Sequence, residues 1–302
     1  MSELVIGSRG SKLALWQANH IAAKLVALGH STRIEIIQTT GDKITDVALS
    51  KVGTKGLFTK EIEEALLAGS IDLAVHSAKD MPTELPAGLV LSAFPEREDP
   101  RDALIGSTLA ALPHGAIVGT SSLRRTAQLR GIRQDLVIND LRGNVDTRLR
   151  KQAEGQYAAI VLAAAGLTRL GWQDRITEFL DPEVFIPAVG QGALAIETRD
   201  DSGAGHAAAV QLDDDATRTR VTAERAALAA MGGGCQVPLG AHAVIGKHGE
   251  INMRGIVVSP DGRLIVNATA TGAGNDPAGV GAALAKKLLA SGASIVLQQV
   301  GM

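Results

Sequence analysis

The sequence predicts two α/β domains with mostly parallel sheets, followed by a small α+β domain with an antiparallel sheet. Three observations support this fold class. Short apolar segments alternate with helical patterns through the first two thirds of the 302 residues. A charged, proline-bearing stretch, 95–104, interrupts the alternation and indicates a hinge or linker between two units of similar rhythm. The last third shows consecutive apolar segments separated by glycine-bearing turns, which is typical of antiparallel sheets.

The first unit begins with a strand, a short loop and a helix. Leu4–Gly7 is a short apolar run, and Ser11 opens a helical pattern that Gly29 closes. A second strand covers Arg33–Gln38 and leads into a polar turn, Thr39–Asp42.

A glycine-punctuated loop, 51–60, then leads into a helix over Lys60–Ala68. Apolar residues alternate from Ile71 to Val75, and polar residues follow at once over His76–Pro82. Open α/β sheets bind ligands at the carboxyl ends of their strands, so this polar segment is a candidate site. A turn that only caps the strand before the proline remains the alternative. Leu89–Phe94 is a further strand.

The second unit repeats this order. Ala116–Gly119 is a strand, and Thr120, Ser121 or Ser122 is the N-cap of a helix that runs to about Arg130. Its later elements are a strand over Leu136–Asn139, a helix entered through 141–144, and an apolar strand over Ala158–Ala164.

The remainder of the chain starts from a second hinge-like stretch, 187–192. A strand over Ala193–Thr198 and a polar, acidic segment, 200–215, precede a helix over about Ala216–Met231. The tail is predicted as three strands, Val237–Ile245, Glu250–Val258 and Arg263–Ala270, and a helix from Asp276 and Pro277 to about Ala290.

The composition is that of an ordinary globular chain. Apolar residues make up 45% and charged residues 21%, and the net charge of −2 argues against bulk nucleic-acid binding. No uninterrupted apolar run reaches the roughly 18 residues of a membrane span. The N-terminus lacks the apolar core of a signal peptide, so we expect a cytoplasmic protein.

Cys235 is the only cysteine and lies in GGGCQVP, 232–238. Three glycines before it and Pro238 after it indicate a tight loop that presents the thiol. A thiol kept only for packing is the alternative, since most free cysteines are buried and inert. A single cysteine excludes an intramolecular disulfide and fits a reducing compartment.

Arginine is concentrated in one part of this slightly acidic chain. Seven lie between residues 124 and 150: Arg124, Arg125, Arg130, Arg133, Arg142, Arg148 and Arg150. Several stand with hydroxyl residues at helix starts, where backbone N–H groups and the helix dipole favour anions. The set predicts a cleft between domains for a small ligand with several carboxylates or phosphates. Each arginine taken alone is explained as well by a solvated surface charge.

Other chemistries lack their motifs. The seven histidines and one cysteine show no zinc spacing, and the sequence has no GxxxxGK[ST], no GxGxxG after a strand and no GxSxG. A non-enzymatic, periplasmic-binding-like protein for a small polyanion therefore remains an alternative to an enzyme. A structural or assembly protein is a third, although it would not need arginine and hydroxyl groups at helix starts.

Taken together, the motifs resemble the porphobilinogen deaminase family, also called hydroxymethylbilane synthase. The resemblance runs almost end to end, through IGSRGSKLALWQ, KVGTKGLF, AVHSAKDMP, EREDPRDAL, VGTSSLRR, LRGNVDTRL, LAAAGLTRLG, PAVGQGALAIE and GGGCQVPLG. It implies two domains similar to periplasmic binding proteins and a smaller third domain that carries the cysteine. The expected boundaries are 1–95 with 193–212 for the first, 100–187 for the second and 215–302 for the third.

The resemblance also implies an activity. It implies a transferase that joins four porphobilinogen molecules head to tail, with loss of ammonia, and releases hydroxymethylbilane for haem-type porphyrin biosynthesis. The implied cofactor is dipyrromethane, two linked porphobilinogen units held by a thioether to Cys235. A cytoplasmic monomer that binds neither nucleic acid nor membrane completes this expectation.

The resemblance implies roles for particular residues. Asp80 matches the catalytic aspartate, which assists departure of the substrate amine, stabilises the positive azafulvene-like species and takes the proton lost on rearomatisation. The implied cofactor-binding residues besides Cys235 are Ser77, Lys79, Thr120, Ser122, Arg124, Arg125, Arg142 and Gly143. The implied substrate-binding residues are Arg9, Ser11, Lys51, Lys55, Phe58, Arg148, Arg169 and Gln191. No metal is implied. Each pyrrole carries an acetate and a propionate, which accounts for the arginines.

Overall fold

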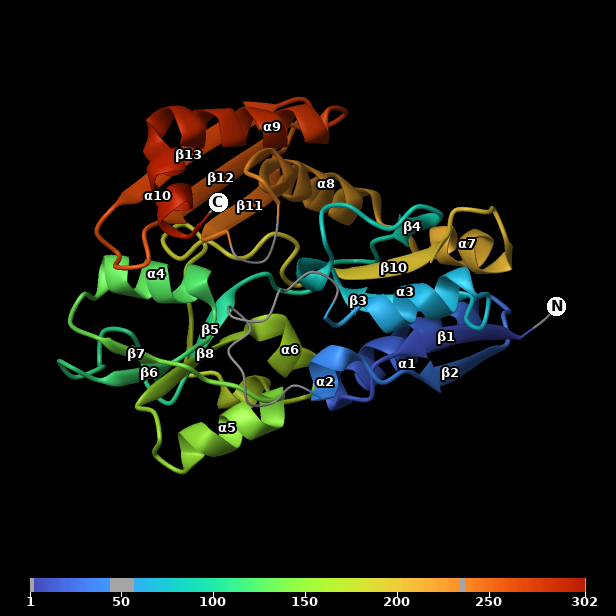
Figure 1. The fold of residues 1–302 in the computed structure, drawn as a ribbon, viewed down its shortest axis with the longest axis horizontal. Helices are drawn as coiled ribbons and strands as arrows, with labels where there is room; N and C mark the ends of the chain where they lie inside the picture. The colour runs from blue at the N-terminus through green and yellow to red at the C-terminus, as the bar shows by residue number, and fades with distance from the viewer. Residues whose placement is uncertain (1–2, 44–56, 234–236, 302) are drawn as a thin grey trace. The chain divides into compact units, whose positions relative to one another are not determined.

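A computed structural model describes residues 3–43, 57–233 and 237–301 (Figure 1). The chain forms two compact units, Met1–Glu98 with Ala193–Arg218 and Asp99–Gly192 with Thr219–Met302. We call them the first unit and the second unit and describe each by itself.

The first unit is built on a five-stranded sheet with the order β2-β1-β3-β10-β4. Its strands are β1 (Leu4–Ser8), β2 (Thr32–Ile36), β3 (Leu73–Ser77), β4 (Leu89–Ala93) and β10 (Leu194–Arg199). Strand β1 pairs in parallel with β2 and β3, whereas β10 pairs antiparallel with β3 and β4. The carboxyl ends of β1 and β3 therefore lie at the same edge of the sheet.

Helices cover both faces of this sheet (Figure 1). Helices α1 (Lys12–Ala27) and α7 (Ala204–Ala209) pack on one face, where Ile21 and Leu25 are fully buried. Helix α3 (Lys60–Leu67) packs on the other face. The short helical turns of this unit are α2 (Thr40–Lys43), η1 (Ala78–Asp80) and η3 (Val210–Leu212).

The second unit contains another five-stranded sheet, with the order β7-β6-β8-β5-β9. Its strands are β5 (Asp102–Ile105), β6 (Ile117–Gly119), β7 (Val137–Asn139), β8 (Ala159–Ala163) and β9 (Glu178–Phe179). Strand β6 is parallel to β7 and β8, and β5 is antiparallel to β8 and β9. Its helices are α4 (Leu123–Ile132), α5 (Val145–Ala153), α6 (Ala164–Arg169) and η2 (Gln173–Arg175). Because β6, β7 and β8 are parallel, their carboxyl ends share one edge of the sheet.

The second unit also holds a three-stranded antiparallel sheet, β11 (Leu239–Ile245), β12 (Ile251–Val258) and β13 (Ile265–Gly272). One face of this sheet packs against the later part of helix α8 (Asp215–Ala230) and against α9 (Pro277–Leu288) and α10 (Ser294–Gln299). Asp276 caps α9, since its side chain accepts a hydrogen bond from the N–H of Gly279 at 3.0 Å.

One stretch of the described residues, Pro277–Gln299, is long and apolar enough to cross a membrane by length and composition. It qualifies although Lys286 and Lys287 interrupt its apolar residues. The stretch is not one regular helix, because Gly292 in the π-helical turn η4 (Leu289–Ala293) has a φ of 102°. Several of its apolar residues, Leu284 and Leu288 among them, pack against the three-stranded sheet.

The predicted fold class is confirmed, with corrections of detail. Residues 102–104, predicted as part of a linker, lie in the buried strand β5. The polar segment 200–215, for which no element was predicted, contains α7 and η3. The division into three domains stays a prediction.

Candidate functional site

In the first unit, predicted site residues follow β1. Ser11 is the N-cap of α1, and its hydroxyl accepts a hydrogen bond from the N–H of Ala14 at 3.3 Å. Arg9 stands between the strand and this cap. Its guanidinium carbon lies 4.2 Å from the ring centroid of Phe58, which is a cation–π distance. The structure therefore brings Arg9, Ser11 and Phe58 to one end of the sheet.

The neighbouring strand β3 places the predicted catalytic residue. Asp80 is the last residue of the turn η1 and is exposed, and Lys79 beside it is half-buried. The N–H of Ala78 donates to the carbonyl of Ala193 at 3.0 Å, which ties the turn to the start of β10. The Ser77 hydroxyl accepts a hydrogen bond from Nε2 of Gln17 at 3.0 Å. A carboxylate is thus presented to solvent from a backbone that is held in place.

A buried cluster of ionisable side chains, His76, Glu197 and Glu63, lies beside β3. Nε2 of His76 lies 3.1 Å from Oε2 of Glu197, a β10 residue that is completely buried. Glu63 of α3 lies near both groups and is also buried. Burial raises the pKa of Glu63 and the Glu197 carboxylate raises it further, against opposing effects of the Thr59 hydroxyl and His76.

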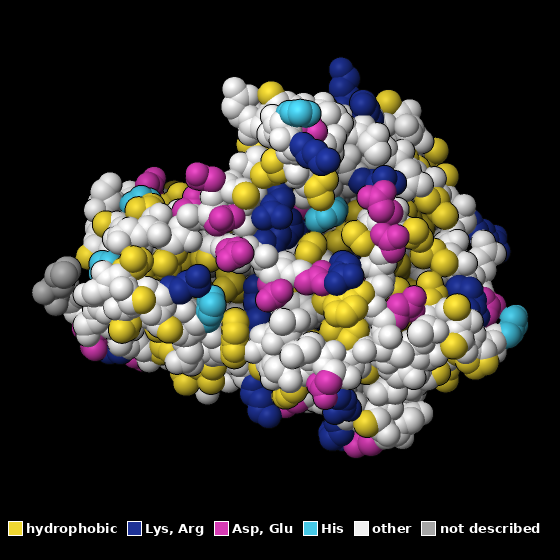
Figure 2. Space-filling model, turned by 180° about the vertical axis from the view of Figure 1, so that it is seen from behind, with side chains coloured by type: hydrophobic (Ala, Val, Ile, Leu, Met, Phe, Trp, Pro, Cys, Tyr) yellow, Lys and Arg dark blue, Asp and Glu magenta, His cyan; other side chains and the backbone are white. Residues whose placement is uncertain are grey.

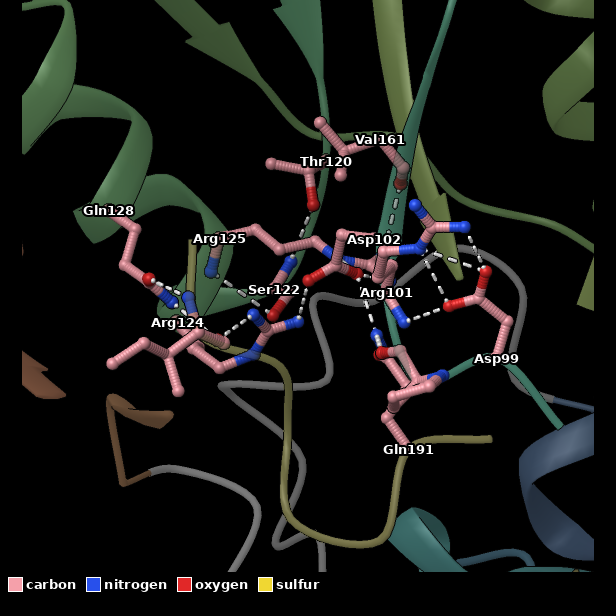
Figure 3. Close-up of polar contacts among 12 residues, drawn as sticks. Asp99, Arg101, Asp102, Thr120, Ser122, Arg124, Arg125, Gln128, Val161 and Gln191 are labelled. Carbon is pink, nitrogen blue, oxygen red and sulfur yellow. Dashed lines mark hydrogen bonds and ion pairs between the residues drawn. The ribbon is translucent and has the colours of Figure 1, made fainter. Parts of the chain in front are cut away.

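In the second unit, the start of α4 carries four predicted residues (Figure 3). Ser122 is the N-cap, and its hydroxyl accepts from the N–H of Arg125 at 3.4 Å. The hydroxyl of Thr120 accepts from the N–H of Ser122 at 3.2 Å. Of the three N-cap candidates, Ser122 is therefore the one that caps.

Arg124 and Arg125 are not on the surface, because both contact the buried carboxylate of Asp102 (Figure 3). Oδ1 of Asp102 accepts from Nε of Arg125 at 2.9 Å and from its Nη2 at 2.6 Å. Oδ2 forms an ion pair with Nη2 of Arg124 at 2.8 Å. Both guanidinium groups also donate to backbone carbonyls. Nη1 of Arg125 donates to the carbonyl of Val161 at 3.0 Å, and Nη1 of Arg124 donates to the carbonyl of Ile186 at 2.8 Å.

Electrostatics decide the ionisation of this cluster. Burial alone would raise the pKa of Asp102, but the charges of Arg124 and Arg125 and their hydrogen bonds outweigh it, so that pKa lies below its usual value. Burial lowers the pKa of Arg124, and Asp102 opposes that change. The cluster contains two guanidinium groups and one carboxylate, so its net charge is positive.

Gln191, from the predicted second hinge, reaches the same carboxylate (Figure 3). Its Nε2 donates to Oδ1 of Asp102 at 3.1 Å and to the carbonyl of Pro100 at 2.7 Å. Arg169, at the end of α6, is also buried, and its Nη2 donates to the carbonyl of Gly192 at 2.6 Å. The hinge segment is thus anchored to the second unit.

The segment between β7 and α5 carries Arg142 and Gly143, and Arg148 follows in the first turn of α5. Nε of Arg148 donates to the carbonyl of Gly143 at 2.7 Å. Gly143 has a φ of +108°, in the left-handed region, and a Cβ there would lie 2.7 Å from Cγ2 of Thr147. The turn that positions Arg148 therefore requires glycine.

The other arginines between residues 124 and 150 have partners within the protein. Arg130 donates to the carbonyl of Pro260 at 2.8 Å, Arg133 pairs with Asp135 at 2.7 Å, and Arg150 pairs with Glu154 at 2.6 Å. Basic and acidic side chains lie interspersed on the face drawn in Figure 2. Arginine composition alone therefore overestimated the number of groups available to an anion.

The predicted residues of each unit meet at one sheet edge, the edge of the carboxyl ends of β1 and β3 in one unit and of β6, β7 and β8 in the other. This is where open α/β sheets bind ligands. Cys235, Lys51 and Lys55 lie outside the described residues. Asp102 was not predicted, although its sequence neighbourhood, EREDPRDAL, is one of the motifs of the resemblance.

The donors at these edges suit a ligand with carboxylates. They are guanidinium groups, a lysine and hydroxyls, and the buried cluster of Asp102, Arg124 and Arg125 has an excess of positive charge. Among the residues that the structure describes, no group of three or more His, Cys, Asp or Glu side chains could hold a metal ion.

Two family models match the chain. The model described as "Porphobilinogen deaminase, dipyromethane cofactor binding domain" matches residues 4–206. The model described as "Porphobilinogen deaminase, C-terminal domain" matches residues 218–290.

Relatives match over nearly the whole length. Porphobilinogen deaminase of Brevibacillus brevis is 52% identical over 99% of this chain and 98% of its own. That of Roseiflexus castenholzii is 54% identical over 98% of this chain and 99% of its own. That of Bacillus subtilis is 53% identical over 99% of this chain and 97% of its own.

Solved structures with similar folds include solute-binding proteins. DctP7, a Bordetella pertussis extracytoplasmic solute receptor binding pyroglutamic acid, is 12% identical, with a TM-score of 0.40 over 70% of this chain and 77% of that chain. Apo YehZ of Escherichia coli is 11% identical, with a TM-score of 0.42 over 70% of this chain and 85% of that chain. These likenesses are too weak to bear on the site.

Proposed function

The chain belongs to the porphobilinogen deaminase family, and from this membership we infer that it joins four porphobilinogen molecules head to tail, with release of ammonia, and hydrolyses the product to hydroxymethylbilane. The observation that carries this function is the pair of family models over residues 4–206 and 218–290, with full-length relatives above 50% identity. The protein is an enzyme of tetrapyrrole biosynthesis, and we place it among the transferases.

The cofactor of this family is dipyrromethane. The site fits it, because dipyrromethane carries carboxylates and the sheet edges supply guanidinium, lysine and hydroxyl donors. When bound, the cofactor supplies the terminal pyrrole to which the first substrate is joined. We propose that Cys235 holds it through a thioether, and that Ser77, Lys79, Thr120, Ser122, Arg124, Arg125, Arg142 and Gly143 contact it.

Asp80 is proposed as the catalytic residue. Its exposed position at the end of a held turn supports this role, since a carboxylate can then face the aminomethyl nitrogen of a bound substrate. The carboxyl group keeps that nitrogen protonated so that it leaves as ammonia, stabilises the positive charge that remains, and takes the proton lost from the ring carbon. Such general acid–base assistance contributes about 10²–10⁴-fold to a rate.

The proposed substrate-binding residues are Arg9, Ser11, Phe58, Arg148, Arg169 and Gln191, with Lys51 and Lys55 from outside the described residues. Support comes from the shared sheet edge in each unit and from the carbonyl contact that orients Arg148. Two carboxylates per ring make several cationic donors necessary as the chain grows.

We further propose a cytoplasmic monomer that binds neither nucleic acid nor membrane. A single cysteine and a net charge of −2 support this proposal. The non-enzymatic binding protein for a small polyanion is not favoured, because the family models and relatives cover nearly the whole chain.

Intact-mass spectrometry tests the function directly. The full chain, produced with a porphobilinogen supply, should carry an adduct of two pyrrole units that Cys235→Ala abolishes, and should convert porphobilinogen to hydroxymethylbilane. An unmodified chain that binds anions reversibly and turns over no porphobilinogen would instead establish the binding-protein alternative.

A further inference from the structure

Asp102 is completely buried, yet it contacts two arginines that the proposed function assigns to the cofactor. We propose that Asp102 is a positioning residue, which holds the guanidinium groups of Arg124 and Arg125 in the arrangement that receives a cofactor carboxylate. This inference rests on the proposed function of the two arginines and extends it to a residue without its own ligand contact.

The hydrogen bonds fix the orientation of Arg125. All three of its guanidinium nitrogens have acceptors, because Nε and Nη2 donate to Asp102 and Nη1 donates to the Val161 carbonyl. A guanidinium group carries five N–H donors, and these bonds use three of them. The remaining N–H bonds of Nη1 and Nη2 point in directions that Asp102 has set.

Arg124 is held in the same way from the other oxygen. Its Nη2 pairs with Oδ2 of Asp102 at 2.8 Å, and its Nη1 donates to the Ile186 carbonyl at 2.8 Å. One carboxylate therefore holds two guanidinium groups, which would otherwise repel each other, at fixed positions on its two oxygens. The 5% and 6% exposure of Arg124 and Arg125 leaves little room for either to move.

The charge balance points to a ligand rather than to stability alone. Two buried guanidinium groups and one carboxylate leave one positive charge in excess. Charge buried without a counter-ion is costly, so the cluster favours one further anion. A cofactor carboxylate supplies it through the donors that Asp102 leaves available.

The place of Asp102 in the sheet supports the same inference. Strand β5 runs antiparallel to β8, and Asp102 lies opposite Ala163, the last residue of β8. Asp102 therefore reaches, from the start of its own strand, the sheet edge at which Thr120, Ser122 and Arg169 also lie.

Asp135 offers a matched control in the same unit. It accepts two hydrogen bonds from Arg133, from Nε and Nη2 at 2.7 Å each, at the other end of α4. Both carboxylates accept from Nε and Nη2 of an arginine, at Oδ1 alone in Asp102 and at both oxygens in Asp135, but no proposed site residue takes part in the Asp135 pair.

The test compares the holoenzymes of Asp102→Asn and Asp135→Asn, with turnover expressed per folded, cofactor-loaded molecule. Asp102→Asn should lower kcat about tenfold or more, because the anchored cofactor loses its alignment. KM for porphobilinogen should stay within about 2-fold, since other residues hold the substrate. Asp135→Asn should leave both constants within about 2-fold. A normal kcat for loaded Asp102→Asn would overturn the proposal.

The variants Arg124→Gln and Arg125→Gln distinguish failure of the proposed function from failure of the positioning role of Asp102. Normal loading and turnover of both variants would overturn the assignment of the arginines, and the present inference with it. Impaired arginine variants beside a normal Asp102→Asn would overturn the positioning role alone.

A crystal structure of the wild-type holoenzyme provides the test if Asp102→Asn does not fold. Both guanidinium groups should keep their Asp102 contacts while a cofactor carboxylate accepts from their other N–H groups. A carboxylate that displaced Asp102 from either arginine, or contacted neither, would overturn the proposal.

Discussion

Nε2 of His76 lies 3.1 Å from Oε2 of Glu197, and both side chains are buried in the first unit. The contact joins β3, which leads to Asp80, to β10. Within the described residues, Oε1 of Glu197 has no hydrogen-bond partner. In the part of the chain that the structure describes, this buried carboxylate therefore depends on its contact with His76.

Glu197→Gln should destabilise the protein by about 1–3 kcal/mol, because it removes a charge-assisted bond at a buried site. Chemical denaturation measures the free energy of unfolding. Glu35→Gln is the control, since Glu35 pairs with Arg33 at 2.9 Å on the surface and should change that free energy by less than about 0.5 kcal/mol. Equal losses in the two variants would contradict the assigned role of Glu197.

Glu63→Gln should stabilise the protein more at pH 7.5 than at pH 4. The pKa of Glu63 is raised by burial, so the folded state binds its proton more tightly than the unfolded state. That contribution is fully present below the unfolded pKa, about 4.3, and is lost as pH rises through the folded pKa. Glutamine keeps the neutral form at every pH.

Thermal unfolding of wild type and Glu63→Gln across this pH range checks the sign. The difference in Tm, variant minus wild type, should become more positive as pH rises. A difference that stayed constant or fell would show that Glu63 does not carry the raised pKa.

Asp80→Asn should lower kcat by about 10²–10⁴-fold, because the amide can neither protonate the amine nor accept the ring proton. Asp80 is exposed, so the melting temperature should not change. Glu84→Gln is a matched control, an exposed carboxylate four residues further along the chain. Steady-state turnover of porphobilinogen decides, and a near-normal rate for Asp80→Asn would remove that residue from its role.

Gly143→Ala should cost more stability than Gly155→Ala. Both glycines have positive φ, +108° and +78°, at opposite ends of α5. A Cβ at Gly143 would meet Thr147, whereas one at Gly155 has nothing within 4 Å. We expect Gly155→Ala to lower the free energy of unfolding by about 1 kcal/mol, from backbone strain alone. Gly143→Ala should lower it by about 2 kcal/mol or more, because the contact with Thr147 adds to the strain.

Turnover separates the two glycine variants further. Gly143 accepts the hydrogen bond that orients Arg148, so only Gly143→Ala should also reduce kcat or stall elongation. Equal stability losses and equal rates would show that the turn before α5 does not constrain Arg148.

Local signals in the sequence predicted the helix starts well. Ser11 and Asp276 cap their helices as expected, because a cap depends on residues within one turn. The strand and helix order of both units followed from apolar periodicity for a similar reason.

Long-range pairing could not be predicted in the same way. Residues 102–104 follow a charged, proline-bearing run and are too few to show an alternation, so the sequence predicts a linker there. Their strand is defined by pairing with β8 and β9, which come much later in the chain. The role of Asp102 is hidden for the same reason, since its partners Arg124 and Arg125 lie on another element.

The site shows a similar division. Sequence motifs predict Asp80 and the arginines as site residues through a family resemblance, but composition does not reveal which arginines contact other parts of the protein. Arg130, Arg133 and Arg150 look equivalent to Arg142 and Arg148 in the sequence, and only the structure shows that they contact Pro260, Asp135 and Glu154.

The position of β10 between β3 and β4 has a consequence for the order of assembly. During synthesis, every strand of the second unit's five-stranded sheet is made before β10. Until β10 is made, β3 and β4 lack the strand that pairs with both of them, whereas all strands of the second sheet are already available. Unpaired strand edges invite aggregation during synthesis. In refolding the whole chain is present, but pairing β10 with β3 closes a longer stretch of chain than pairing β8 with β6. Pulsed hydrogen exchange should therefore protect amides of β6 and β8 before those of β3 and β10, and the reverse order would mean that the distant strand docks early.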